Sequence, residues 1–185
     1  MRLKKWEDFG IENEDRFRSF NYNELTGVMI AQFTKNITDK LWLQSIYTRN
    51  RDSNTYKRLT EKSKLLSYDD PVTGSKSKYL YFNISEWNKR GEYYGGNWLK
   101  TQRVNLETLE FDNSFSSEDF DLSDKYSDGR ISHLNQVSDD GNEINCVVGL
   151  TNKKEVFPNA GYWVSKLYFE EKSIELLRKF CSAFF

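Results

Sequence analysis

Residues that could do chemistry are few in this chain, and the largest group is an acidic run. Residues 118–128 contain Glu118, Asp119, Asp121, Asp124 and Asp128. Several carboxylates on one bent loop are the ligands that Ca²⁺ prefers. A divalent metal held by Asp119, Asp121 and Asp124 would suit a metal-dependent hydrolase, which is one function considered for this chain. The spacing does not fit an EF-hand, because the sixth position from Asp119 is Asp124 instead of glycine. A solvated connector is therefore the preferred interpretation.

A second group is aromatic and lies in residues 86–97, which we expect to form a long loop. It contains Trp87, Arg90, Tyr93 and Tyr94 beside three glycines. Exposed rings on a flexible backbone are typical of a protein-binding or glycan-binding surface. The corresponding segment 153–161 carries Phe157, which we add to the predicted partner-binding residues. The alternative is that these rings only cap the core.

Apart from the acidic run, no residue pattern predicts an enzyme or a cofactor site. His133 is the single histidine, and a structural or surface role is the preferred interpretation. The two cysteines, Cys146 and Cys181, do not form a disulfide framework or a metal knuckle. Glycine-rich phosphate loops, nucleophile elbows and zinc-binding helices are absent from the sequence. We therefore predict no cofactor, and a non-enzymatic role is favoured.

The composition limits the class of partner. The 27 basic and 28 acidic residues give a net charge of −1, so the chain as a whole has no electrostatic attraction to the phosphate backbone of nucleic acid. A basic hairpin is a local exception, carrying Arg49, Arg51, Lys57 and Arg58, although a solvated turn is preferred there. No apolar run is long enough to span a membrane, and the N-terminus lacks the apolar core of a signal peptide. A cytoplasmic location is the resulting expectation.

The elements that position these residues are predicted to be β-strands. Asp139, Asp140, Gly141 and Asn142 supply turn chemistry between two apolar runs, which is the signature of a β-hairpin. Aromatic residues make up 16% of the chain, a composition that favours strands. The final piece, residues 173–181, fits either a strand or an amphipathic helix, and both remain open.

The hairpin unit recurs three times. An N-terminal arm (residues 1–14) precedes repeat 1 (15–60) and repeat 2 (64–112), and an acidic connector (113–129) leads to repeat 3 (130–181). Each repeat reads as two strands, a Trp-bearing strand and a short fourth strand, with Trp42, Trp98 and Trp163 in the third position. The fold class predicted is a single all-β domain of antiparallel four-stranded meanders. A β-sandwich or β-barrel with a C-terminal helix is the alternative.

The segments S-D-D-G-N-E-I-N-C-V-V and Y-W-V-S-K-L-Y-F-E-E-K-S-I-E-L-L resemble the hairpins of β-propellers of the WD-repeat or prolyl-oligopeptidase type. The resemblance covers most of residues 15–180 and implies propeller-like blades. It also implies that the loops 35–40, 86–97 and 153–161 share one face with the connector. Closed propellers have about 4–8 blades, whereas three segments are found here. A homo-oligomer covering the open sheet edges is therefore considered.

Together these observations predict an interaction module that binds a protein partner through loops on one face. A glycan-binding module that uses the rings of residues 86–97 is the alternative binding function. The metal-dependent hydrolase that uses residues 118–128 is the alternative enzymatic function.

Overall fold

The structure is a computed structural model that describes residues 5–11, 14–90, 93–121, 126–152 and 160–179. Its strands form three four-stranded antiparallel sheets, and within each sheet the strands lie in sequence order. Sheet A contains β1 (Arg16–Asn23), β2 (Val28–Thr38), β3 (Leu41–Asn50) and β4 (Lys57–Arg58). Sheet B contains β5 (Leu66–Thr73), β6 (Tyr79–Arg90), β7 (Tyr93–Asn105) and β8 (Glu110–Ser116). Sheet C contains β9 (Tyr126–Val137), β10 (Glu143–Asn152), β11 (Ala160–Tyr168) and β12 (Ser173–Lys179).

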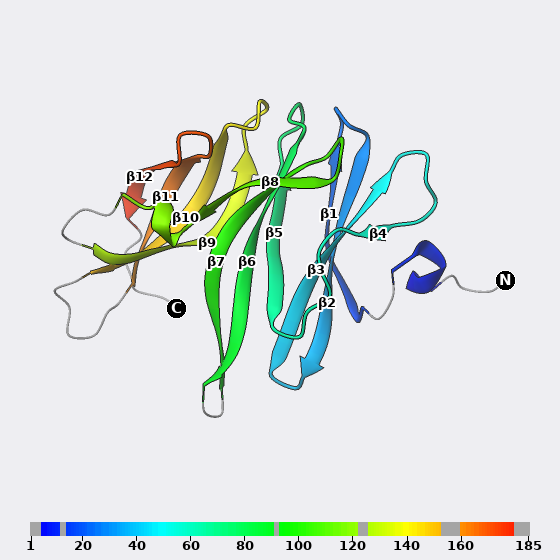
Figure 1. Ribbon diagram of the computed structural model, residues 1–185, viewed down its shortest axis with the longest axis horizontal. Helices are drawn as coiled ribbons and strands as arrows, with labels where there is room; N and C mark the ends of the chain where they lie inside the picture. The colour runs from blue at the N-terminus through cyan, green and yellow to red at the C-terminus, as the bar shows by residue number, and fades with distance from the viewer. Residues whose placement is uncertain (1–4, 12–13, 91–92, 122–125, 153–159, 180–185) are drawn as a thin grey trace.

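The prediction of all-β, four-stranded meanders is confirmed. The described residues contain no α-helix, only two short 3₁₀ turns, η1 (Trp6–Phe9) and η2 (Ser117–Asp119). None of the three sheets closes into a barrel. The three tryptophans that mark the repeats lie on the third strand of each sheet, on β3, β7 and β11. Figure 1 shows sheet B standing between sheets A and C, with η1 and β12 at opposite sides of the molecule.

Local turn chemistry explains the meanders. Gly27 between β1 and β2 and Gly141 between β9 and β10 both adopt positive φ, at 69° and 87°. This conformation is accessible to glycine without a steric penalty. At Gly141 the predicted Asp-Asp-Gly-Asn turn closes the hairpin that joins β9 to β10. The Ser138 N–H donates to the Glu143 carbonyl at 2.8 Å, and the Glu143 N–H donates to Ser138 Oγ at 2.9 Å.

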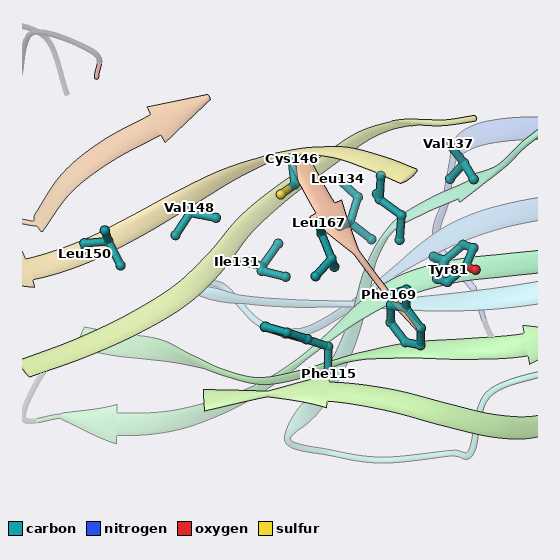
Figure 2. Packing of buried hydrophobic residues seen from close by; sticks show 11 residues of the cluster. Tyr81, Phe115, Ile131, Leu134, Val137, Cys146, Val148, Leu150, Leu167 and Phe169 are labelled. Carbon is teal, nitrogen blue, oxygen red and sulfur yellow. The ribbon is translucent and has the colours of Figure 1, made fainter. Parts of the chain in front are cut away.

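Sheet B is apolar on both faces and therefore holds the molecule together. Side chains alternate along β6, so Leu80, Phe82 and Ile84 point toward sheet A while Tyr81 points toward sheet C. The first group packs against Ile30 and its neighbours on β2 and β3. Figure 2 shows the second core, where Tyr81 and Phe115 of sheet B meet apolar side chains of sheet C and Phe169. The Tyr81 hydroxyl also donates to the Gly141 carbonyl at 2.6 Å.

The faces of sheets A and C that are turned away from sheet B differ in character. On sheet A, the N-terminal segment lays Ile11 over Phe33, and the Trp6 ring meets Phe33 edge-on at 5.3 Å between centroids. Within the predicted N-terminal arm, Trp6–Phe9 form the 3₁₀ turn η1. On sheet C, the face turned away from sheet B carries polar pairs, such as Lys166 Nζ with Glu143 Oε2 at 2.8 Å. Such a face tolerates water.

Several expected loops are strands instead. Residues 86–97 do not form a long loop, because β6 runs to Arg90 and β7 resumes at Tyr93. Backbone pairing continues through Trp87 with Gly96 and Asn88 with Gly95, so the turn-forming glycines there do not prevent pairing. Residues 35–40 are similarly shortened, since β2 continues to Thr38. For residues 173–181 the structure decides in favour of a strand, β12, and the last two of these residues lie outside the described part. Both ends of the predicted acidic connector are strand residues, since β8 runs to Ser116 and β9 begins at Tyr126.

A matched pair of phenylalanines tests the role of sheet B. Phe82 is fully buried between sheets A and B, whereas Phe111, which meets it edge-on at 6.2 Å, is 48% exposed. Phe82→Ala is expected to lower the free energy of unfolding by about 3–5 kcal/mol, because it removes a ring and leaves a cavity. Phe111→Ala, the control, is expected to cost about 1 kcal/mol or less. Equal losses in urea unfolding would show that the apolar layer does not lie where the structure places it.

Candidate functional site

A pocket opens where the three sheets meet. Its volume is about 420 Å³, and its walls come from all three sheets. Sheet A contributes Arg18, Gln32 and Gln44; sheet B contributes Asp69, Asp70, Ser85, Trp87, Gly96 and Trp98; and sheet C contributes residues 130–133 of β9. A site made by three sheets depends on their relative placement, which makes it a feature of the whole fold. We call it the junction pocket.

The pocket begins where the apolar core between sheets A and B ends. Side chains two residues apart on a strand share one face. On β2 the core residue Ile30 is followed on the same face by Gln32, which lines the pocket. On β3 the core residue Ile46 is likewise preceded on the same face by Gln44. Both glutamines are anchored, since Gln32 Nε2 donates to the Tyr68 carbonyl and Gln44 Nε2 donates to Asp69 Oδ1. These fixed polar groups line the pocket at positions where apolar side chains would have continued the core.

An irregularity in β5 places the acidic pair. The register of β5 against β6 shifts between Asp69 and Val72, and Asp70 has φ of 53°. A bulge of this kind redirects side chains, and positive φ in a residue other than glycine is strained. Asp70 is directed toward β9, where its Oδ2 lies 3.2 Å from Nδ1 of His133. Sheets B and C are thus joined through this pair at the rim of the pocket.

Asp69 is held in a less hydrated environment. Its Oδ1 accepts hydrogen bonds from Gln44 Nε2 at 2.5 Å and from Ser67 Oγ at 2.8 Å. Burial raises the pKa of Asp69 to about 6, and the neighbouring charge of Asp70 adds to this effect. The hydrogen bonds from Ser67 and Ser85 and the charge of His133 act in the opposite direction. Burial also raises the pKa of Asp70, against the lowering effect of His133.

Two tryptophans form the aromatic part of the wall. Trp87 on β6 pairs with Gly96 on β7, and its ring lies over that glycine, where an added Cβ would be 3.1 Å from ring atoms. The Trp87 indole N–H is buried and has no hydrogen-bond partner among the described residues. The Trp98 indole, by contrast, donates to Asn83 Oδ1 at 3.2 Å. Trp87 is therefore the ring with an unused polar group.

The charges of the junction pocket balance. Arg18 and Arg130 oppose Asp69 and Asp70, and none of these four side chains forms an ion pair with another. Arg130 Nη2 instead donates to the Tyr162 hydroxyl at 2.8 Å. Such a pocket favours neither a strong anion nor a strong cation on charge alone. It offers donors, acceptors and a ring to a polar ligand.

The predicted partner-binding residues are only partly placed by the structure. Trp87 lines the junction pocket, and Tyr94 is half-buried near the β6–β7 tip, opposite Lys89 in register. Arg90 and Tyr93 end and begin their strands, and Phe157 lies outside the described residues. Their part in binding stays a prediction.

The sheet B and sheet C residues that line the junction pocket together with Trp87 are not among the predicted site residues. In sequence, Asp69, Asp70 and Pro71 are typical of a turn. The structure shows a bulged strand there instead. His133 was interpreted as structural or exposed, and it is exposed, but it also pairs with Asp70. An acidic pair before proline, inside a strand-length apolar segment, was the available signal.

The predicted metal ligand Asp119 already has hydrogen-bond partners within the chain. Asp119 Oδ1 accepts from Lys172 Nζ at 2.9 Å, and Asp119 Oδ2 accepts from the Ser116 N–H at 2.8 Å. Burial of Asp119 would raise its pKa, but these bonds outweigh it and lower the pKa. Asp121 lines the same cavity as Asp119 and Lys172, and Asp124 lies outside the described residues. In the part of the chain that is described, no three metal-ligating side chains cluster.

Comparison with known proteins gives little further information. No family model matches the sequence, and no curated protein matches it. Among solved structures, the chain is similar to dipeptidyl peptidase 4 of Porphyromonas gingivalis, with a TM-score of 0.46 and 9% sequence identity. The match covers 87% of this chain and 32% of that one, so the chain spans about a third of its length. No inference about function follows from a likeness of this degree. No helix in the described ranges is long and apolar enough to cross a membrane.

The raised pKa of Asp69 gives a prediction with a definite sign. The folded state keeps the proton of Asp69 up to about pH 6, whereas the unfolded chain releases it near the ordinary value of 3.8. Ionisation therefore destabilises the fold, and this contribution to stability falls as pH rises from about 4 to about 6. We expect Asp69→Asn to gain stability relative to the wild type across that interval, measured as the free energy of unfolding in urea at each pH.

Asp140→Asn is the matched control with the opposite sign. Hydrogen bonds from the Ser138 hydroxyl and the Asn142 N–H lower the pKa of Asp140. Its carboxylate therefore stabilises the fold above its ordinary pKa, and that contribution is lost as pH falls. A pH-independent difference between Asp69→Asn and the wild type would contradict the assigned environment of Asp69.

Proposed function

We propose that this chain is a non-enzymatic interaction module and that it binds a segment of a protein partner at the junction pocket. The observation that carries the proposal is the pocket itself, where strands from three sheets present a tryptophan, both signs of charge and anchored amides in one concavity. Sites with a buried aromatic anchor and a few fixed polar groups are typical of recognition surfaces.

We further propose that the three sheets are propeller-like blades. The first strand of each sheet lies beside the first strand of the next: Asn21 Nδ2 of β1 donates to the Pro71 carbonyl of β5, and Asp70 of β5 pairs with His133 of β9. First strands gathered in this way, with the sheets packed face to face, support this proposal, because propellers repeat four-stranded sheets around a centre. The junction pocket would then open along their inner edges.

Chemical groups in the pocket support binding more than catalysis. His133 Nδ1 pairs with Asp70, but no described serine hydroxyl of the pocket is hydrogen-bonded to His133 as an activated nucleophile requires. Cys146 is fully buried in the core, and burial raises the pKa of its thiol to about 12, so it holds its proton at neutral pH. Neither arrangement offers an attacking group to a substrate.

A glycan is the second candidate ligand, and one observation favours it. The charges lining the pocket cancel, and carboxylates, amides and guanidinium groups surround the Trp87 ring. A neutral ligand with many hydroxyls could use these donors and acceptors together with the face of the ring. A peptide segment would use the same groups through its backbone and one inserted side chain.

One experiment separates the two ligands. The purified chain is used to select from a random-peptide display library and, separately, to probe a glycan array. We expect an enriched peptide, whose affinity is then titrated against the wild type, Trp87→Ala and Trp42→Ala. Trp87→Ala is expected to weaken binding by at least about tenfold, as the loss of an aromatic anchor does. Trp42 is 38% exposed on β3 and lines no part of the pocket, so Trp42→Ala serves as the matched control.

The outcomes are distinct. A glycan that binds the wild type and is lost in Trp87→Ala would replace the peptide proposal with the glycan candidate. Equal binding by both tryptophan variants would place recognition outside the junction pocket. Melting temperatures of the variants are measured in parallel, and a Trp87→Ala chain that no longer unfolds cooperatively would make this ring part of the core. The less disruptive Trp87→Phe then tests binding in a folded chain.

A further inference from the structure

A second concavity lies on sheet A and is lined by cations. Its volume is about 570 Å³, and it is formed by the end of β2, by β4 and by the segment that joins β4 to β5. The lining residues are Lys35, Asn36, Ile37, Arg58, Lys62, Ser63 and Lys64. Four of the seven carry a positive charge and none carries a negative one. It shares no residue with the junction pocket.

Arg58 forms a fixed wall of this basic cavity. Its Nη1 lies 2.7 Å from Oε1 of Glu14, whose side chain is only 1% exposed, and the same nitrogen donates to the Tyr47 hydroxyl at 3.2 Å. Its Nε donates to the Thr60 carbonyl at 2.9 Å. Arg58 is therefore held rigidly, and most of its charge is balanced by Glu14.

The three lysines are not balanced in this way. Lys35, Lys62 and Lys64 form no ion pair with any residue that the structure describes. Two acidic residues nearby along the chain, Asp15 and Glu61, have other surroundings. Asp15 accepts from the backbone N–H of Asn36 at 2.6 Å, and Glu61 lines a separate apolar groove with Tyr68.

Uncompensated like charges around one concavity repel each other, and a bound anion would relieve that repulsion. Lysine ammonium groups act as compact point charges with three donors each, which suits the oxygen atoms of a phosphate. Because the whole chain has a net charge of −1, attraction to anions must come from this local cluster. A compact group carrying at least two negative charges satisfies three lysines better than a single carboxylate.

We propose that the basic cavity binds a phosphoryl group through Lys35, Lys62 and Lys64, with Arg58 as its fixed wall. The group could belong to a free phosphate-containing small molecule or to a phosphorylated side chain of a partner, since both present the same chemistry. Binding is non-covalent and falls as the salt concentration rises.

Isothermal titration calorimetry at low ionic strength tests this with inorganic pyrophosphate, with a doubly phosphorylated serine peptide, and with the same peptide carrying glutamate at both positions. The wild type is expected to bind pyrophosphate, and Lys35→Gln/Lys62→Gln/Lys64→Gln is expected to bind it at least about tenfold more weakly, because three charged donors are lost. The matched control removes the same charge elsewhere: Lys57→Gln/Lys76→Gln/Lys89→Gln, at exposed lysines that do not line the cavity.

The results decide between the sources and can overturn the proposal. If pyrophosphate binds more tightly than the phosphopeptide, the ligand is a small molecule. If the phosphopeptide binds more tightly, the ligand is a modified partner.

No measurable pyrophosphate or phosphopeptide binding by the wild type would refute the site. So would equal losses in the two triple variants, which would mean that overall charge alone matters. Equal affinity for the glutamate peptide would replace phosphate with an acidic segment. Lys35→Arg/Lys62→Arg/Lys64→Arg, which keeps the charge, is expected to retain binding and shows that a loss in the glutamine variant is not a folding defect.

Discussion

The packing of sheet B against two neighbours is the interaction on which the rest of the structure depends. A sheet with one apolar face can rest on one partner, but β6 alternates Leu80, Tyr81 and Phe82 so that both faces need cover. Water cannot satisfy either face, because burial of apolar surface is the dominant favourable term in folding. Sheets A and C therefore stack on opposite sides of sheet B, and their relative placement follows from the two cores.

Each candidate site lies where regular packing or strand pairing stops. The core between sheets A and B ends when glutamines replace isoleucines on β2 and β3, and the junction pocket begins there. The acid pair in that pocket is directed by a bulge that the neighbouring strands hold in place, with strain at Asp70. On sheet A, β4 has only two residues, so the chain leaves the sheet early and its lysine-rich continuation bounds the basic cavity. In each case a functional candidate occurs where regular pairing is interrupted.

Much of the fold could be predicted from sequence because its signals are local. Period-two alternation, Asp-Gly turn chemistry and the spacing of Trp42, Trp98 and Trp163 act over a few residues or repeat along the chain. Strand ends were harder to predict: the glycines near Trp87 indicated a loop, yet pairing with β6 extends through them. Tertiary pairing overrides local propensity in such hairpins.

The junction pocket could not be predicted because its parts are far apart in sequence. Asp70 and His133 are 63 residues apart and meet only after sheets B and C have packed. Trp87 was selected for its ring and flexible neighbours, but nothing in the chain indicated which polar groups would surround it. Non-local contacts of this kind depend on a bulge and on sheet placement, and neither leaves a repeating pattern in one sequence.

The three sheets converge so that residues of separate repeats form one pocket, and the pair of Asp70 and His133 lies at its rim. His133 is the single histidine of the chain, so its imidazole protons give ring signals that need no comparison with another histidine. A nuclear Overhauser measurement between these ring protons and the β protons of Asp70 tests the claim directly. We expect a clear cross-peak, because Nδ1 of His133 lies 3.2 Å from Oδ2 of Asp70. Absence of that cross-peak in the folded chain, with intact strand signals, would contradict it.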